Sequence, residues 1–290
     1  MSIKHPIISV TGSSGAGTST VKKTFDQIFR REGISSVSIE GDAFHRYNRA
    51  DMRAELERRQ AEGDHTFSHF SYDANELGEL ERVFREYSQT GKGRTRTYVH
   101  DAEESEKTGV PPGEFTAWAP FPDDSDLLFY EGLHGSVVND EVNLAALADL
   151  KIGVVPVINL EWIQKIHRDR ESRGYSTEAV TETILRRMQD YVHCICPQFS
   201  ETDINFQRVP VVDTSNPFIA RWIPTPDESL VVIRFKNPRG IDFPYLMSMI
   251  EGSWMTRANS LVIPGGKMDL AMQLIFTPMV IRLVREAKRA

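Results

Sequence analysis

The sequence has few cysteines, no excess of basic residues and no long hydrophobic run. Its two cysteines, Cys194 and Cys196, stand one residue apart, which is a poor basis for a disulfide framework, and no Cys/His spacing indicates zinc. This cysteine usage favours a reducing, cytoplasmic location. The longest mostly apolar run, residues 152–160, is far too short to span a bilayer, and the N-terminal stretch reads as a strand. We therefore expect neither a membrane span nor a signal peptide.

Acidic residues outnumber basic ones, 41 to 34, for a formal net charge of −7. A dedicated nucleic-acid-binding protein usually has a basic domain, so small-molecule partners are expected and nucleic acid is not. An anionic substrate would have to be bound by a local arginine cluster, because the net field of the protein repels it. The 290 residues, 40% hydrophobic and 26% charged, fit one large globular domain and exclude a disordered or collagen-like chain.

Strand-like and helix-like segments alternate along the chain. A strand at 7–10, a Gly-rich loop at 12–20, a helix at 21–31 and a strand at 36–39 form one βαβ unit. Further helices are expected at 46–60, 76–87, 162–173, 177–193 and 268–288, and further strands at 94–100, 126–131, 152–158, 209–212 and 230–235. This order predicts an α/β fold, a single domain over 1–290 whose sheet is mixed but mainly parallel, with helices on both faces. The polar stretch 91–122 is long for a compact domain and predicts a lid or an oligomer contact.

The first candidate for chemistry is the loop between the first strand and the first helix. Its backbone amides and the helix N-terminus could bind a phosphate, and Ser19 could offer a hydroxyl to Mg²⁺. The Walker pattern matches at Gly12, Gly17 and Ser19, but Thr18 stands where lysine is required. A cation from elsewhere in the chain would then have to replace that lysine; the alternative is an ordinary Gly-rich turn. The ATP-binding candidates are Gly12, Ser13, Ser14, Gly15, Ala16, Gly17, Thr18, Ser19 and Thr20.

Two carboxylates follow later strands of the same predicted sheet. Asp42 comes directly after the second strand, and therefore falls on the same edge as the loop, where it could accept a proton from an attacking hydroxyl. His45 and Arg49, just beyond it, could hold a second anion. Glu131 ends an apolar strand, which is where a Walker-B acid holds Mg²⁺. Taken alone, Asp42 could equally be a helix N-cap.

A third charged group lies on one predicted helix. Lys165, Arg168, Asp169 and Arg173 occupy positions i, i+3, i+4 and i+8, and therefore share one helix face. Three cations around one carboxylate suit a site that handles two phosphate groups and a metal, because an arginine fork bonds two phosphate oxygens at once. The alternative is a solvated salt-bridge face.

The order of these motifs resembles a known family. GSSGAGTST, EGDAFHR, LLFYEGLHG and KIHRDRESRGYS, with HTFSHFSYDANEL and QRVPVVDTSNPF outside them, resemble the bacterial phosphoribulokinases, within the uridine-kinase-like group of P-loop kinases. The resemblance runs from about Ile7 to the last helix. It implies a three-layer fold like that of nucleotide monophosphate kinases. It also implies transfer of the γ-phosphoryl group of ATP to the C1 hydroxyl of D-ribulose 5-phosphate, giving the ribulose 1,5-bisphosphate of the Calvin cycle.

The resemblance also implies roles for single residues. Asp42 matches the general base, Asp169 the second essential carboxylate, and Glu131 the Walker-B-like acid. Lys165 matches a cation near the ATP phosphates and could replace the lysine missing from the loop. The candidate Mg²⁺ ligands are Ser19, Asp42, Glu131 and Asp169. The candidate substrate-binding residues are His45, Arg49, Tyr98, His100, Arg168 and Arg173.

Regulation differs between branches of the family. The plant-type enzymes carry a thioredoxin-controlled cysteine in the loop, at the position of Ala16, so no thiol switch is expected in this chain. The bacterial type is activated by NADH, inhibited by AMP and assembled as an octamer. Such effectors carry phosphates, and the candidate allosteric residues are Arg31, Arg234 and Arg257.

Two other functions compete with this interpretation. A nucleoside or pantothenate kinase of the same group shares most of the motifs, but usually keeps the loop lysine and needs aromatic stacking rather than His45 and Arg49. A non-catalytic nucleotide sensor could have lost turnover with the loop lysine. It would not need Asp42, Asp169 and Arg173 together.

Overall fold

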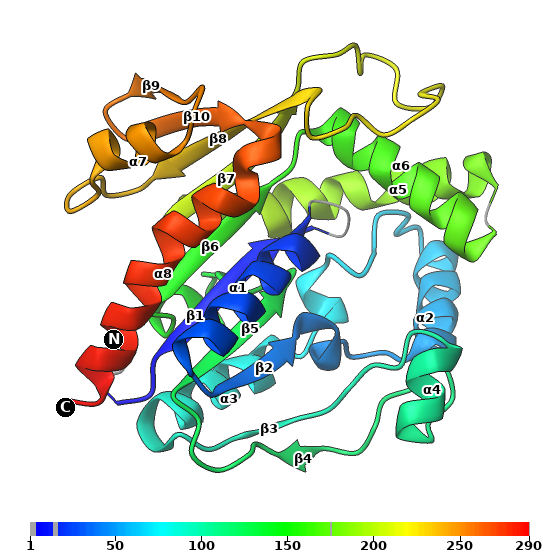
Figure 1. Ribbon diagram of the computed structural model, residues 1–290. Helices are drawn as coiled ribbons and strands as arrows, with labels where there is room; N and C mark the ends of the chain where they lie inside the picture. Colours follow the sequence, from blue (N-terminus) through cyan, green and yellow to red (C-terminus); the bar gives the residue numbers. More distant parts are fainter. Residues whose placement is uncertain (1–3, 14–16, 175, 290) are drawn as a thin grey trace.

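The computed structural model describes residues 4–13, 17–174 and 176–289, without the side chains of Ser19, Ser172 and Arg173. An eight-stranded sheet crosses it in the order β2-β5-β1-β6-β7-β8-β10-β9 (Figure 1). The first five strands in this order are parallel, and the last three continue antiparallel. The strands are β1 (Ile7–Gly12), β2 (Ser36–Glu40), β5 (Leu127–Gly132), β6 (Leu150–Val155), β7 (Ile204–Pro210), β8 (Ser229–Phe235), β9 (Trp254–Arg257) and β10 (Ser260–Pro264).

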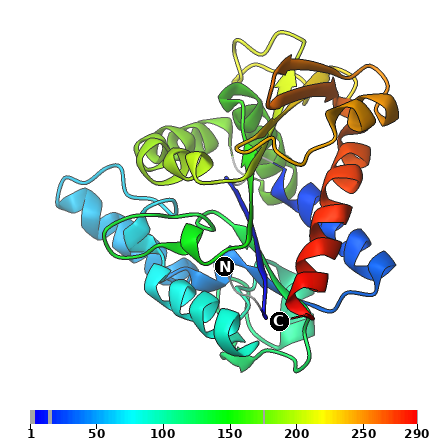
Figure 2. The same cartoon turned by 90° about the vertical axis from the view of Figure 1, so that its left-hand side faces the viewer.

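Helices cover both faces of the sheet, so the fold has three layers (Figure 2). On one face, α1 (Thr18–Glu32) and α8 (Met268–Ala287) lie side by side over a core in which Phe276 stacks on Phe25 and Phe206, at centroid distances of 4.9 and 5.5 Å. On the other face, α3 (Leu77–Thr90) buries a stripe of side chains spaced three and four residues apart, which is the amphipathic pattern of a helix packed on a sheet.

Further helices border the carboxyl ends of the parallel strands (Figure 1): α2 (Arg49–Ala61), α4 (Ala102–Thr108), α5 (Ile158–Arg173) and α6 (Thr177–Asp190). The two-stranded ribbon of β3 (Arg94–Thr95) and β4 (Ala119–Pro120) runs below α3 and β2 in this view, and α7 (Phe243–Met249) lies beside the antiparallel edge. The stretch 91–122 thus consists of β3, α4 and β4 with their connections, and its role as a lid or oligomer contact stays a prediction. None of the described helices is long and apolar enough to cross a bilayer.

The predicted α/β class, the βαβ start and the mixed, mainly parallel sheet are confirmed, but several boundaries were wrong. The strand expected at 152–158 is β6, which ends at Val155 because Pro156 has no amide to donate and α5 begins at Ile158. The strand expected at 209–212 is the end of β7. The first half of β7 was missed because polar residues alternate there with the buried Ile204 and Phe206. The helix expected at 177–193 ends at Asp190 and continues as a π-helical turn over Tyr191–Ile195.

The strand expected at 94–100 forms only in part: β3 covers Arg94–Thr95, and pairing resumes as an isolated antiparallel bridge between Tyr98 and Phe115. Between them the guanidinium of Arg96 donates to the carbonyl oxygens of Ala43 and His45, at 2.8 Å each, and lies over the ring of Phe115. These side-chain bonds hold the segment against the residues after β2. Several short helices and strands were not expected at all: α4, β4, α7, β9 and β10.

Phe276 is the aromatic contact that joins α8 to α1 and the sheet, so its removal should destabilise the whole fold. We expect Phe276→Ala to lower the free energy of unfolding by about 3–5 kcal/mol through the cavity it leaves. Thermal unfolding measures this, at roughly 2–4 °C for each kcal/mol in a domain of this size. Leu270→Ala on the same helix, at a side chain with 38% exposure, is the control and should change little. Equal losses in both variants would contradict the packing described here.

Candidate active site

The candidate residues meet at the carboxyl edge of the parallel strands. β1 runs into the Gly-rich loop, β2 into a 3₁₀ turn that contains Asp42, and β5 into Glu131. The strand register places Glu40 beside Glu131 and Thr11 beside Gly132, so the three strands end at the same level. In open parallel sheets, ligands bind at this edge, at the point where neighbouring strands are followed by connections to opposite faces of the sheet.

The described part of the phosphate loop is tightly built against β6. Gly12 has no room for a side chain, since a Cβ would lie 2.6 Å from Thr18 Cγ2 and 3.0 Å from the carbonyl oxygen of Val154. Gly17 caps α1 with a φ of 101°, a conformation that favours glycine. The first amides of α1 therefore face the loop, as an anion site requires. Ser14, Gly15 and Ala16 lie outside the described residues, as does the side chain of Ser19.

Asp42 is surrounded by imidazoles and is not a helix cap. Its Oδ1 lies 3.2 Å from Nε2 of His45 and its Oδ2 lies 3.3 Å from Nε2 of His100. Tyr98 packs edge-on against His100 at 4.9 Å between ring centroids. Burial alone would raise the pKa of Asp42, but the two imidazoles outweigh it and hold the pKa of this carboxyl well below its usual range. Asp42 is therefore a carboxylate, ready to accept a proton.

Arg49 joins the same group from the start of α2. Arg49 Nη2 donates to the carbonyl oxygen of His100 at 2.9 Å, so the guanidinium lies next to one of the two histidines that contact Asp42. Arg49 itself remains exposed. Two distant stretches of the sequence, one with His45 and Arg49 and the other with Tyr98 and His100, are thus brought together around one carboxylate.

Glu131 lies on the other side of the edge, against the first residue of α1. Burial raises the pKa of Glu131, while a hydrogen bond from the Thr18 side chain opposes the shift. The described residues contain no group of three or more His, Cys, Asp or Glu side chains that could hold a metal. A carboxylate, a hydroxyl and substrate phosphates do form the oxygen donor set that Mg²⁺ uses in phosphate-transfer sites, so Glu131 fits such an ion as one of few protein ligands.

The charged face of α5 forms as its spacing predicts. Lys165 Nζ lies 2.5 Å from Asp169 Oδ2, and Arg168 Nε donates to Asp169 Oδ1 at 3.1 Å. Burial, reinforced by the charge of Arg187 on α6, lowers the pKa of Lys165 to about 8. Burial would raise the pKa of Asp169, but its two cations lower it. The Arg173 side chain lies outside the described residues.

One residue of this face escaped the sequence analysis. Glu161, one helical turn before Lys165, is buried, and its Oε1 accepts a hydrogen bond of 2.6 Å from the loop residue Ser13. Burial raises the pKa of Glu161 to about 7. The spacing could have identified Glu161, because Glu161, Lys165 and Asp169 follow one another at four-residue intervals on one helix face. Arg187, whose charge acts on Lys165, lies on α6, and no sequence spacing relates it to α5.

A cleft of about 100 Å³ opens beside the loop, between α1, α5, β6, β7 and the start of α8. Its walls are largely apolar, with Glu161, Gln164 and Arg208 as its polar side chains. The lining residues are Gly17, Thr20, Val154, Val155, Pro156, Val157, Leu160, Glu161, Gln164, Phe206, Arg208 and Met268. An apolar cleft with a few polar groups next to a phosphate loop is suited to a nucleoside.

The three candidate allosteric arginines lie away from this edge. Arg31 on α1 donates to Gln273 and Thr277 of α8 at 2.9 and 2.7 Å. Arg234 and Arg257 both lie beside Ser260 in the strand register, and alternation along β8 directs Arg234 away from the face that α8 covers. Within one chain the structure therefore does not bring Arg31 together with the other two.

Comparison with known proteins agrees with this geometry. The family model described as "Phosphoribulokinase / Uridine kinase family" matches residues 7–215. Phosphoribulokinases 2 and 1 of Cereibacter sphaeroides are 81% and 80% identical over 290 residues, covering 100% of this chain and 99% and 100% of those proteins. The phosphoribulokinase of Nitrobacter vulgaris is 71% identical over 99% of both chains.

A solved structure matches over the same length. The phosphoribulokinase from Rhodobacter spheroides superposes with a TM-score of 0.92 at 78% identity, covering 99% of this chain and 100% of that one. With the phosphate loop, the carboxylate edge and the α5 cation face in place, the chain belongs to the phosphoribulokinase / uridine kinase family, as a kinase that phosphorylates an alcohol.

Proposed function

We propose that the chain transfers the γ-phosphoryl group of ATP to the C1 hydroxyl of D-ribulose 5-phosphate, forming ribulose 1,5-bisphosphate for the Calvin cycle. The observation that carries the proposal is Asp42, a carboxylate held between His45 and His100 on the edge where the phosphate loop ends. Arg49 places a positive charge near Asp42, which suits an acceptor substrate that already carries a phosphate group. Relatives about 80% identical that are named phosphoribulokinase support the same reaction.

The proposed reaction needs one proton acceptor and one phosphoryl acceptor. Asp42 takes the proton of the C1 hydroxyl as that oxygen forms a bond to the γ-phosphorus, and the bond from that phosphorus to the bridging oxygen of ADP breaks. The facing imidazoles keep Asp42 ionised until the proton arrives. Most of the rate enhancement then comes from orientation and from charge placed around the transferring group.

Cations on both sides would hold the two substrates. His45, His100 and Arg49 lie at Asp42, where they would bind the sugar phosphate with Tyr98. Arg168 and Arg173 belong to α5 and would stabilise the transferring group, with Lys165 on the ATP phosphates. The adenosine would occupy the apolar cleft beside Gly17 and Thr20. A cytoplasmic location belongs to the same proposal, in keeping with two unpaired cysteines.

ATP and Mg²⁺ are the phosphoryl donor and the metal that a kinase of this family requires. When bound, the metal neutralises charge that develops on the β- and γ-phosphates. Ser19, Asp42, Glu131 and Asp169 are the residues proposed to hold it. Both oxygens of Asp169 already contact cations on its own helix, so Glu131 is the ligand that the arrangement favours most.

Release of ADP from ATP and Mg²⁺ tests the function directly, with D-ribulose 5-phosphate and uridine compared as acceptors. We expect turnover with the sugar phosphate alone. Asp42→Asn keeps the side-chain shape without the base and should lower kcat by about 10²–10⁴-fold. Turnover with uridine alone would make the chain a nucleoside kinase. ATP binding with no turnover of either acceptor would make it a nucleotide sensor.

Lys165 is proposed to supply the positive charge that Thr18 cannot. Lys165→Met should reduce kcat by about 10²–10³-fold, as does the loss of one donor to a developing charge in other enzymes. Steady-state kinetics with ATP varied would measure this. Lys236→Met removes a half-exposed lysine elsewhere on the surface and is the control. Unchanged turnover in Lys165→Met would refute the replacement.

Activation by NADH, inhibition by AMP and assembly as a homo-octamer are also proposed. Arg31 and Arg234 lie on opposite faces of the sheet, so one effector could contact both only across a contact between two copies of the chain. Replacing Arg31, Arg234 and Arg257 together by alanine should abolish the increase in rate that NADH produces. Arg239→Ala, at another exposed arginine, should retain it. An intact NADH response in the triple variant would show that the effector binds elsewhere.

A further inference from the structure

A buried amide, Asn75, connects the imidazole beside Asp42 to the interior of the protein. We propose that Asn75 is a positioning residue that fixes the ring of His45, so that Nε2 is the nitrogen presented to Asp42 and to the sugar phosphate. The inference deepens the proposed function and rests on it for its kinetic consequence. Its structural part, the hydrogen position on His45, can be tested without any substrate.

The backbone places Asn75 opposite His45. Residues 45 and 75 form an antiparallel bridge, flanked by hydrogen bonds from the amide of Arg46 to Ala74 and from the amide of Glu76 to Phe44, at 2.9 and 2.7 Å. Both side chains are buried. The two groups therefore meet as a fixed pair, although thirty positions separate them along the chain.

The orientation of the Asn75 amide follows from its neighbours. Its Nδ2 donates to the carbonyl oxygens of His69 and Ser71, at 3.0 and 2.7 Å. The reverse orientation would set the amide oxygen against both carbonyls, with no hydrogen between them. Oδ1 therefore faces Nδ1 of His45, at 2.9 Å. Because an amide oxygen can only accept, Nδ1 of His45 must carry a hydrogen.

This assignment determines what His45 offers to the site. With Nδ1 committed to Asn75, the opposite nitrogen, Nε2, is left at 3.2 Å from Asp42 Oδ1. The same Asn75 nitrogen lies 3.1 Å from Nε2 of His134, whose other nitrogen is 3.4 Å from the amide of Gln198. Both hydrogens of the Asn75 amide are used by the carbonyls of His69 and Ser71, so His134 is a packed neighbour and Asn75 alone orients the imidazole of His45.

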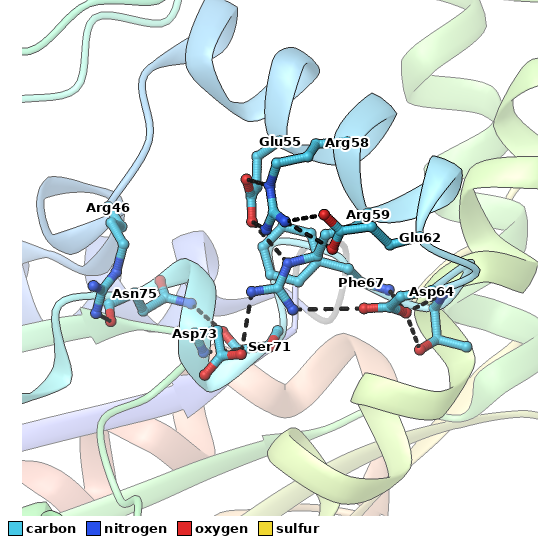
Figure 3. Close-up of polar contacts among 11 residues, drawn as sticks. Arg46, Glu55, Arg58, Arg59, Glu62, Asp64, Phe67, Ser71, Asp73 and Asn75 are labelled. Atoms are coloured by element: carbon cyan, nitrogen blue, oxygen red, sulfur yellow. Dashed lines mark hydrogen bonds and ion pairs between the residues drawn. The ribbon is translucent and has the colours of Figure 1, made fainter.

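The segment that carries Asn75 is itself anchored to α2. Arg59 reaches from α2 to Asp64 and Asp73, at 3.5 and 3.3 Å, and lies over the ring of Phe67 at 3.9 Å (Figure 3). Figure 3 also shows Asn75 beside Ser71, at the end of this segment. These contacts, all with residues that precede Asn75, hold the segment in place without His45, as a positioning residue requires.

The hydrogen position can be measured by solid-state ¹⁵N NMR on protein labelled at histidine, with His45 identified from the spectrum of His45→Ala. We expect a protonated Nδ1 in the wild-type protein and, in Asn75→Leu, a mixture in which part of the His45 population has lost the Nδ1 hydrogen. A bare Nδ1 in the wild-type protein would overturn the proposal. This spectrum needs no variant at Asn75, so it decides even where Asn75→Leu does not fold.

The kinetic test is a double-mutant cycle. Asn75→Leu should lower kcat/KM for D-ribulose 5-phosphate by about 10–100-fold, the scale of a misplaced group, while KM for ATP stays within about twofold. If Asn75 acts through His45, His45→Ala combined with Asn75→Leu is no worse than His45→Ala alone. If the kcat/KM losses of the two single variants multiplied in the double variant, Asn75 would support the fold only.

Asn205→Leu is the matched control. Asn205 on β7 also binds a backbone carbonyl, that of Phe199, at 3.0 Å, and accepts from Thr202 at 2.7 Å. The Asn205→Leu variant should lose thermal stability and keep the wild-type kcat/KM for D-ribulose 5-phosphate. If the wild-type protein does not turn over the sugar phosphate, the proposed function fails, and the ¹⁵N spectrum still decides the role of Asn75.

Discussion

The structure depends on one constraint: parallel strands put their carboxyl ends on the same edge of a sheet. β2, β5, β1 and β6 obey it, so the phosphate loop, Asp42, Glu131 and the start of α5 leave the sheet at one level although they span more than a hundred residues of sequence. The aromatic packing of α1 and α8 on one face, and of α3 on the other, keeps that edge rigid. The chemistry proposed for the chain is a consequence of this geometry.

We propose that a cation on α5 replaces the Walker lysine, whose position Thr18 occupies. Glu161, Lys165 and Asp169 follow one another at four-residue intervals, so one helix face contacts the loop through Ser13 and carries a buried cation beside it. Thr18 is not idle, because its side chain bonds Glu131. The space around Thr18 is limited, since a Cβ added at Gly12 would lie 2.6 Å from Thr18 Cγ2.

The sequence was sufficient for the fold class and for the order of the motifs, because both follow from local patterns: alternation, helical spacing and Gly-rich turns. It did not identify Glu161, the carboxylate of α5 that binds Ser13. It was insufficient where contacts are distant. Asn75 and His45 meet through a bridge between two irregular segments, and Arg187 acts on Lys165 from a different helix. Polar strand residues concealed the first half of β7. The interruption between β3 and the bridge of Tyr98 with Phe115, where Arg96 binds the carbonyl of Ala43, also left no signal in the local sequence.

The most direct test of the account is a crystal structure with ADP, Mg²⁺ and D-ribulose 5-phosphate bound. We expect the C1 hydroxyl of the sugar within hydrogen-bond distance of Asp42 and the ADP phosphates on the loop. Lys165 should be directed toward the space between the sugar and the ADP phosphates. The sugar bound with another hydroxyl at Asp42, or with C1 directed away from the nucleotide, would contradict the account.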